Sequence, residues 1–172
     1  MSKAESTWIE SLERFFCFPD SKSLDIIGLG NPIRNDDGVG VWITERLRAE
    51  TRRLRTGSVR ITSSSTRSEY VISKLAEREN HMLIVDAVEF ESPPGSVLFA
   101  SLHDTKYGFF ATHNVPLRLI PSLSTRAESV NILGIRPLDT DVGEKLSDPV
   151  GKSAQRVVQE LRRMILGRRG IY

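Results

Sequence analysis

Short apolar runs alternate with amphipathic segments over residues 24–85, and this alternation is the strongest constraint on the fold. Leu24–Leu29 (LDIIGL) and Val59–Thr62 have the composition of strands, and Met82–Val85 (MLIV) is fully apolar, as expected for a strand buried on both faces. Apolar residues at helical spacing predict one helix that begins at Gly38 and another over Thr66–Arg78. Such a β-α-β-α-β series predicts a parallel sheet covered by helices.

The connection that follows is too short to continue this rhythm. Only eight residues separate Ala87 from Ser96, whereas a parallel return needs a crossover of about a dozen residues or more. We therefore expect the next strand, Val97–Ala100, to be antiparallel. The remaining predicted elements are a helix over Val115–Leu123, a strand over Val130–Gly134 and a closing helix over Ser147–Leu166. The fold class is α/β, a three-layer α/β/α sandwich with a mixed, mostly parallel sheet of about five strands.

The first 22 residues are predicted to form an amphipathic helical extension. Trp8, Leu12, Phe15 and Phe16 fall on one face of a helix. Residues 23–172 then form a single α/β domain, because no linker, repeat or low-complexity tract divides them.

Composition excludes several classes of function. The chain has 172 residues, 39% of them hydrophobic, and 24 basic against 22 acidic residues leave a net charge of +2. This balance gives no electrostatic basis for a nucleic-acid partner. No apolar run approaches the roughly 18–20 residues of a membrane span. The single cysteine, Cys17, suits a reducing compartment, so we expect a cytoplasmic protein.

The segment Gly28–Gly40 (GLGNPIRNDDGVG) joins the first strand to the first helix, where open α/β sheets bind ligands. It is not a dinucleotide fingerprint, because that pattern needs glycine at the position of Ile33. The later GKS at Gly151–Ser153 is not a phosphate loop, because Leu146 stands where glycine is required. The chain also has no GxSxG or HExxH motif.

Two adjacent acids in this segment suggest a site. Asp36 and Asp37 lie at the mouth of a helix; one can cap it, and the other is free to point into the crevice. Asp86 follows the apolar run of the third strand, and the carboxyl ends of the first and third strands flank the predicted switch point. His113, in ATHNVP, is the third candidate. Two carboxylates and an imidazole suit a divalent metal such as Zn, Ni or Co with open coordination positions.

The four segments GLGNPIRNDDGVG, LIVDA, THNVP and ILGIRP, in this order, resemble the hydrogenase maturation endopeptidases. THNVP is most similar to the subgroup serving membrane-bound, hydrogen-evolving hydrogenases. The resemblance covers about residues 24–166 and implies a phosphorylase/hydrolase-like fold. One departure is Ser63–Thr66, which stands where a Gly-Gly-Thr-like turn is common.

The resemblance implies that Asp37, Asp86 and His113 bind nickel and that both aspartates are catalytic. It implies removal of a C-terminal extension from a [NiFe]-hydrogenase large-subunit precursor once nickel is in place. The nickel would be carried by that substrate, so the isolated protein is expected to hold no tightly bound metal, with Zn or Cd as substitutes. Residues expected to contact the substrate are Asn31, Asp36, Thr66 and Asn114.

Two alternatives stay open at this point. A metal- or ligand-sensing module could keep the fold and the ligands without cleaving anything. Peptidyl-tRNA hydrolase also begins with GLGNP, but it has Thr-Arg-His-Asn soon after that loop, where this chain has Asp36, Asp37 and Gly38.

Overall fold

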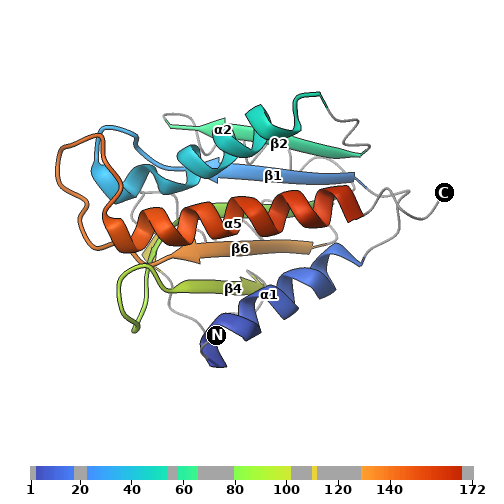
Figure 1. Cartoon of the computed structure of the whole chain (residues 1–172), viewed down its shortest axis with the longest axis horizontal. Helices are drawn as coiled ribbons and strands as arrows, with labels where there is room; N and C mark the ends of the chain where they lie inside the picture. Colours follow the sequence, from blue (N-terminus) through green and yellow to red (C-terminus); the bar gives the residue numbers. More distant parts are fainter. Residues whose placement is uncertain are drawn as a thin grey trace.

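A computed structural model describes residues 3–17, 23–53, 58–65, 80–101, 110–111 and 129–167. Figure 1 shows a sheet with helices lying across it. The helices are α1 (Lys3–Phe16), the short 3-10 helix η1 (Asn35–Gly38), α2 (Val39–Thr51) and α5 (Asp148–Gly167). The strands are β1 (Ser23–Leu29), β2 (Val59–Ser64), β3 (Asn80–Glu89), β4 (Val97–Ser101), β5 (Phe110–Ala111) and β6 (Ser129–Ile135).

The strand order β2-β1-β3-β6-β4 confirms the predicted mixed sheet. β1 pairs in parallel with both β2 and β3, and β3 pairs in parallel with β6. β4 is antiparallel to β6, as its short connection required. The chain therefore reverses its direction of winding between β1 and β3, and their carboxyl ends flank one crevice.

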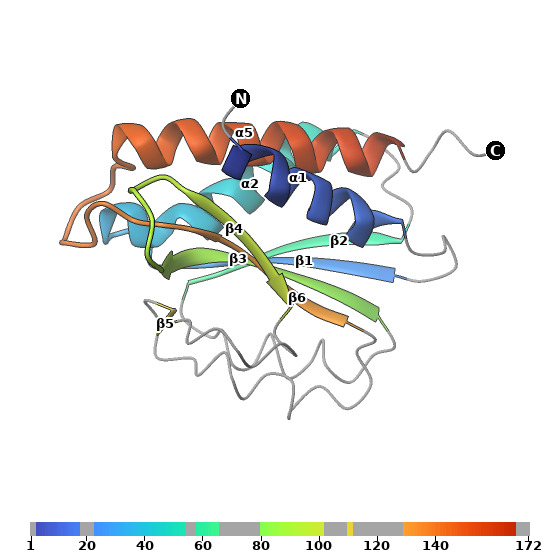
Figure 2. The ribbon, with the colours of Figure 1, turned by 90° about the horizontal axis from the view of Figure 1, so that it is seen from below.

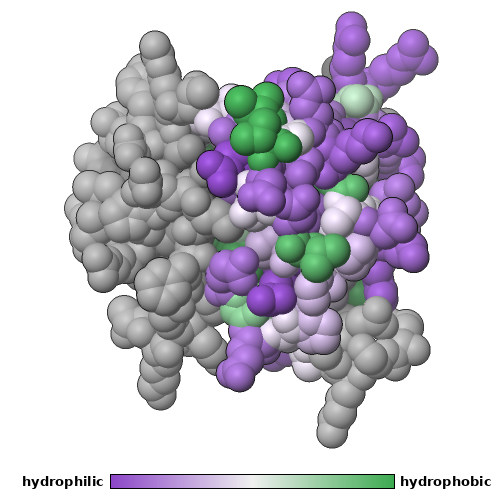
Figure 3. All heavy atoms as spheres, turned by 90° about the vertical axis from the view of Figure 1, so that its left-hand side faces the viewer, coloured by the Kyte–Doolittle hydropathy of each residue, from purple (hydrophilic) through white to green (hydrophobic). Residues whose placement is uncertain are grey.

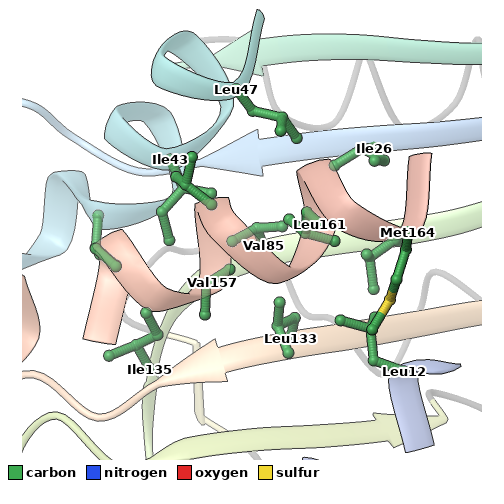
Figure 4. Close-up of a cluster of buried hydrophobic side chains, with 14 of the residues drawn as sticks. Leu12, Ile26, Ile43, Leu47, Val85, Leu133, Ile135, Val157, Leu161 and Met164 are labelled. Atoms are coloured by element: carbon green, nitrogen blue, oxygen red, sulfur yellow. The ribbon is translucent and has the colours of Figure 1, made fainter. Parts of the chain in front are cut away.

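Helices α1, α2 and α5 lie on one face of the sheet (Figure 2). Amphipathic α5 buries Val157 and Leu161 against β6 and β3, and α2 contributes Ile43 and Leu47 to the same cluster (Figure 4). The predicted apolar face of the first helix is confirmed, because α1 adds three buried side chains to this core: Trp8, Leu12 and Phe16. The domain boundary at residue 22 stays a prediction.

The opposite face of the sheet is buried too, which fits a sheet covered on both sides. Its buried side chains are Ile27, Leu29, Met82, Ile84, Val88, Ala100, Val130 and Ile132. The helices predicted over residues 66–78 and 115–123 lie outside the described residues.

Two predicted boundaries are wrong, and both corrections affect the site. The helix predicted to begin at Gly38 begins one residue later, at Val39, and the residues before it close into the 3-10 turn η1. β3 does not end at Val85 but runs on to Glu89, where its last residues pair with β5. β3 therefore continues past the end of its pairing with β1, because its last residues pair with β6 and then with β5.

The first turn of α2 touches the backbone of β1 and β3 because glycines remove the intervening side chains. A Cβ atom on Gly40 would lie 2.1 Å from the carbonyl oxygen of Val85 and 2.2 Å from that of Leu29. A Cβ on Gly28 would lie 2.1 Å from the carbonyl oxygen of Gly40. Only glycine allows such an approach at these positions.

We predict that Gly40→Ala lowers the free energy of unfolding by about 3 kcal/mol, since a methyl group there overlaps two backbone carbonyls. Gly151→Ala is the matched control: the nearest atom to its added Cβ is 3.9 Å away. In helix α5 alanine should stabilise by about 0.5–1 kcal/mol. Urea unfolding measures the free energy of unfolding of both variants. Equal changes for Gly40→Ala and Gly151→Ala would contradict the close contact of α2 with the sheet.

Candidate active site

Four aspartates are buried in the described part of the chain: Asp25, Asp36, Asp37 and Asp86. Asp25, near the start of β1, is neutralised by Arg60 of β2, whose guanidinium donates two hydrogen bonds of 2.6 and 3.0 Å. The other three belong to the opposite end of the sheet, at the carboxyl ends of β1 and β3. These three form the candidate site.

Asp37 is held by the backbone of the loop between β1 and α2. Its amide donates to the carbonyl of Arg34 (3.0 Å), and its carbonyl accepts from the amide of Asn31 (3.2 Å). Gly30 lies against the Asp37 carbonyl with a φ of +145°, a conformation that favours glycine. The Asp37 residue is only 3% exposed.

Asp86 lies on β3 immediately beyond its last pairing with β1, Val85 with Gly28. Its residue is fully buried, and its Oδ1 atom accepts a 2.8 Å hydrogen bond from the amide of Ala87. Because Gly40 seats α2 on Val85, the preceding turn η1 contacts β3. The fold thus brings Asp37 and Asp86 to one place, although 49 residues separate them in the sequence.

The two carboxylates interact electrostatically. Burial raises the pKa of Asp86 well above its usual range, the hydrogen bond from Ala87 acts in the opposite direction, and the negative charge of Asp37 raises the pKa further. Each carboxylate also has one buried oxygen, Oδ1 of Asp37 and Oδ2 of Asp86, that accepts no hydrogen bond from the described residues. The pair therefore favours a bound proton or a cation.

Asp36 holds the loop of residues 136–147 against η1. Its Oδ2 accepts hydrogen bonds from the amides of Leu138 (2.9 Å) and Asp139 (3.0 Å) and from the hydroxyl of Ser147 (2.8 Å). Its Oδ1 accepts from the Ser147 amide at 2.7 Å. The prediction that one of the two acids caps the helix is wrong: neither η1 nor α2 has a side-chain cap. The substrate contact expected of Asp36 stays a prediction.

Asn35 and Arg34 complete this attachment, which the sequence analysis did not anticipate. The Asn35 amide donates to the carbonyl of Gly143 (2.8 Å), and its side chain donates to the Asp139 carboxylate (2.8 Å). Arg34 donates to the carbonyl of Thr140 (3.0 Å). The sequence signal for this attachment was the run of turn-forming residues DTDVG (139–143) that follows β6.

The other predicted site residues have mixed outcomes. Asn31 shapes the turn, since its side chain accepts a 3.3 Å hydrogen bond from the Ile33 amide; its substrate contact stays a prediction. Thr66, His113 and Asn114 lie outside the described residues. Within the ranges that the structure describes, no group of three His, Cys, Asp or Glu side chains is placed to hold a metal, so the ligand set stays a prediction.

The fold and site define an α/β domain with a mixed sheet and with paired acids at its switch point. Residues 41–164 match the model of the hydrogenase maturation protease family, HycI. The chain therefore belongs to this family of endopeptidases. Membership decides against peptidyl-tRNA hydrolase and supports an enzyme over a sensor. The narrower likeness to the subgroup for membrane-bound hydrogenases stays a prediction.

Individual relatives agree with this assignment. A protein of Methanocaldococcus jannaschii, provisionally named a hydrogenase maturation protease, is 26% identical over 146 residues, which cover 80% of this chain and 93% of that protein. The crystal structure of the [NiFe] hydrogenase maturation protease HycI from Thermococcus kodakarensis has a TM-score of 0.73 and 25% identity, covering 90% of this chain and 98% of its own. The solution structure of the endopeptidase HycI from Escherichia coli has the same fold, with a TM-score of 0.66, 24% identity and coverages of 82% and 90%.

No helix in the described ranges combines the length and the apolar character that crossing a membrane requires.

We predict that Asp86→Asn stabilises the metal-free protein, and more so as the pH rises. A carboxyl with a raised pKa binds its proton more tightly when folded, so the wild type loses stability as the pH rises from the unfolded-state value through the raised one. Asparagine does not titrate. Urea unfolding with a chelator at about pH 4 and about pH 8 should show a larger gain at the higher pH. The exposed control Asp148→Asn should show little change; an equal gain for Asp86→Asn at both pH values would contradict the assignment.

Proposed function

We propose that this enzyme removes the C-terminal extension of a [NiFe]-hydrogenase large-subunit precursor after nickel insertion, and that it recognises the nickel centre itself. The observation that carries the proposal is the pair of buried carboxylates, Asp37 and Asp86, side by side at the carboxyl ends of β1 and β3. Membership in the hydrogenase maturation protease family supports a hydrogenase precursor as the substrate. The single exposed Cys17 suits a reducing compartment, the cytoplasm.

Nickel would be bound by Asp37, Asp86 and His113. Carboxylate oxygens and an imidazole nitrogen suit a borderline divalent ion. The position of β5 supports His113 as the third ligand. β5 pairs with β3 two residues beyond Asp86, and it ends two residues before His113 in the sequence. Three ligands leave the coordination shell open, so the substrate supplies the rest, and the isolated protein takes up Zn or Cd only when these are provided.

The electrostatics of the pair make it a receptor for a cation. Without metal, Asp86 tends to keep a proton, because burial and the charge of Asp37 disfavour its ionised form. A divalent ion reverses this preference, so binding releases the proton. The nickel centre of the substrate thereby changes the protonation state of the site at which the peptide is cut.

Two routes to hydrolysis are compatible with these residues. Asp37 can act as a general base that takes a proton from the attacking water, with nickel only positioning the peptide. Alternatively, Asp37, Asp86 and His113 would hold nickel, which would supply a Lewis acid for the scissile carbonyl or the attacking water. In both routes the water adds to the carbonyl carbon, the C–N bond breaks and the amine leaves with a proton.

We predict that Asp37→Asn lowers the rate of precursor processing by at least about a hundredfold while the protein stays folded, since the amide keeps the size but loses the charge and the basicity. His113→Ala should lower the rate less, because water can replace one ligand. The matched control is Asp148→Asn, at an exposed position at the start of α5, and it should process normally. The measurement is the intact mass of the large subunit over time, and wild-type rates in folded Asp37→Asn would remove this residue from the site.

A further inference from the structure

A pocket with a volume of about 280 Å³ lies beside the active site, between α2, α5 and the two loops that Asp36 joins. Pro32 and Gly38, from the loop that carries Asp37, form one wall. Trp42 and Leu146 provide apolar surface, and the carboxylates of Glu45 and Glu144 also line the pocket. Its size suits a single long side chain.

The charge of this pocket is not compensated within the described residues. Glu45 and Glu144 are exposed and take part in no ion pair there, and no lysine or arginine is among the described residues that line the pocket. Four other glutamates of the described chain are paired: Glu13 and Glu160 with Arg163, Glu89 with Arg136, and Glu50 with Arg46 and Arg162. The next hollow along the groove between α2 and α5 is lined by Arg46 with its partner Glu50. Of these two hollows, the one lined by Glu45 and Glu144 has no basic side chain among its described residues.

Single large apolar side chains are exposed around the pocket. The large apolar side chains exposed in the described part of the chain are Ile33 (58%), Trp42 (36%), Leu138 (60%) and Val142 (86%). Ile33, Leu138 and Val142 lie on the two joined loops, and Trp42 lines the pocket. Figure 3, which faces this end of the molecule, shows separate apolar patches among hydrophilic atoms. These side chains form no single large patch, so the pocket that they surround is the feature that suits a partner.

We propose that the large-subunit precursor docks on this surface and inserts one basic side chain, arginine or lysine, into the pocket. The cation stacks on the ring of Trp42 and pairs with the carboxylates of Glu45 and Glu144. The apolar side chains of the two loops surround this anchor and exclude water from it. This inference rests on the proposed function, because it names how the same substrate is held next to the two catalytic carboxylates.

The test compares cleavage of nickel-loaded precursor by the wild type and by the double variant Glu45→Gln, Glu144→Gln. Both positions are exposed, so the variant should fold, which circular dichroism checks. We expect KM to rise about tenfold at low salt with kcat unchanged, and the difference to shrink as salt screens the charges. Glu10→Gln, an exposed glutamate of α1, is the control and should keep the wild-type KM. Trp42→Phe, which keeps a stacking surface, should raise KM less than Trp42→Ala.

The outcomes separate this inference from the proposed function. If the wild type cleaves and the folded double variant has the same KM, the pocket inference is overturned and the proposed function stands. If the wild type binds the precursor without cleaving it, and the double variant binds about tenfold more weakly, docking stands and the proposed cleavage falls. No binding by the wild type overturns both. A further outcome is that the wild type self-associates, the double variant does not, and KM is unchanged. This result would instead assign the pocket to a second copy of the chain.

Discussion

The contact of α2 with the backbone of β1 and β3 is the constraint on which the site depends. Gly28 and Gly40 let the first turn of the helix lie directly on the carbonyls of Leu29 and Val85. The turn η1 is thereby set over the end of β3, and Asp37 comes to lie beside Asp86. Side chains at either glycine would separate helix and sheet, and the two carboxylates with them.

The electrostatic repulsion at the site lowers the stability of the folded protein, and the rest of the fold offsets this loss. Two buried carboxylates close together disfavour ionisation, and rigid surroundings are needed to hold them there. Asp36 supplies part of this rigidity, because its carboxylate fixes the loop of residues 136–147 through the amides of Leu138, Asp139 and Ser147. Under the proposed function, a cation delivered by the substrate would relieve this repulsion, and the site would thereby select a metal-bearing partner.

The sequence predicted the sheet because its signals were local and strong. The apolar run of β3 and the short connection to β4 gave strand type and direction, and the switch point between β1 and β3 predicted that Asp37 and Asp86 meet. The role of Asp36 was not predictable, because its partners lie more than 100 residues away in a loop with only generic turn residues. The extension of β3 to Glu89 was missed for a similar reason: it depends on pairing with the distant strand β6 and with the two-residue strand β5.

The central claim is that the paired acids respond to nickel carried by the substrate, and the most direct measurement compares two forms of one precursor. Nickel-free and nickel-loaded large subunit are incubated separately with metal-free enzyme, and the intact mass of each is followed. The account predicts loss of the C-terminal extension from the nickel-loaded form alone. Equal cleavage of both forms would contradict it, as would stoichiometric nickel in the freshly purified enzyme.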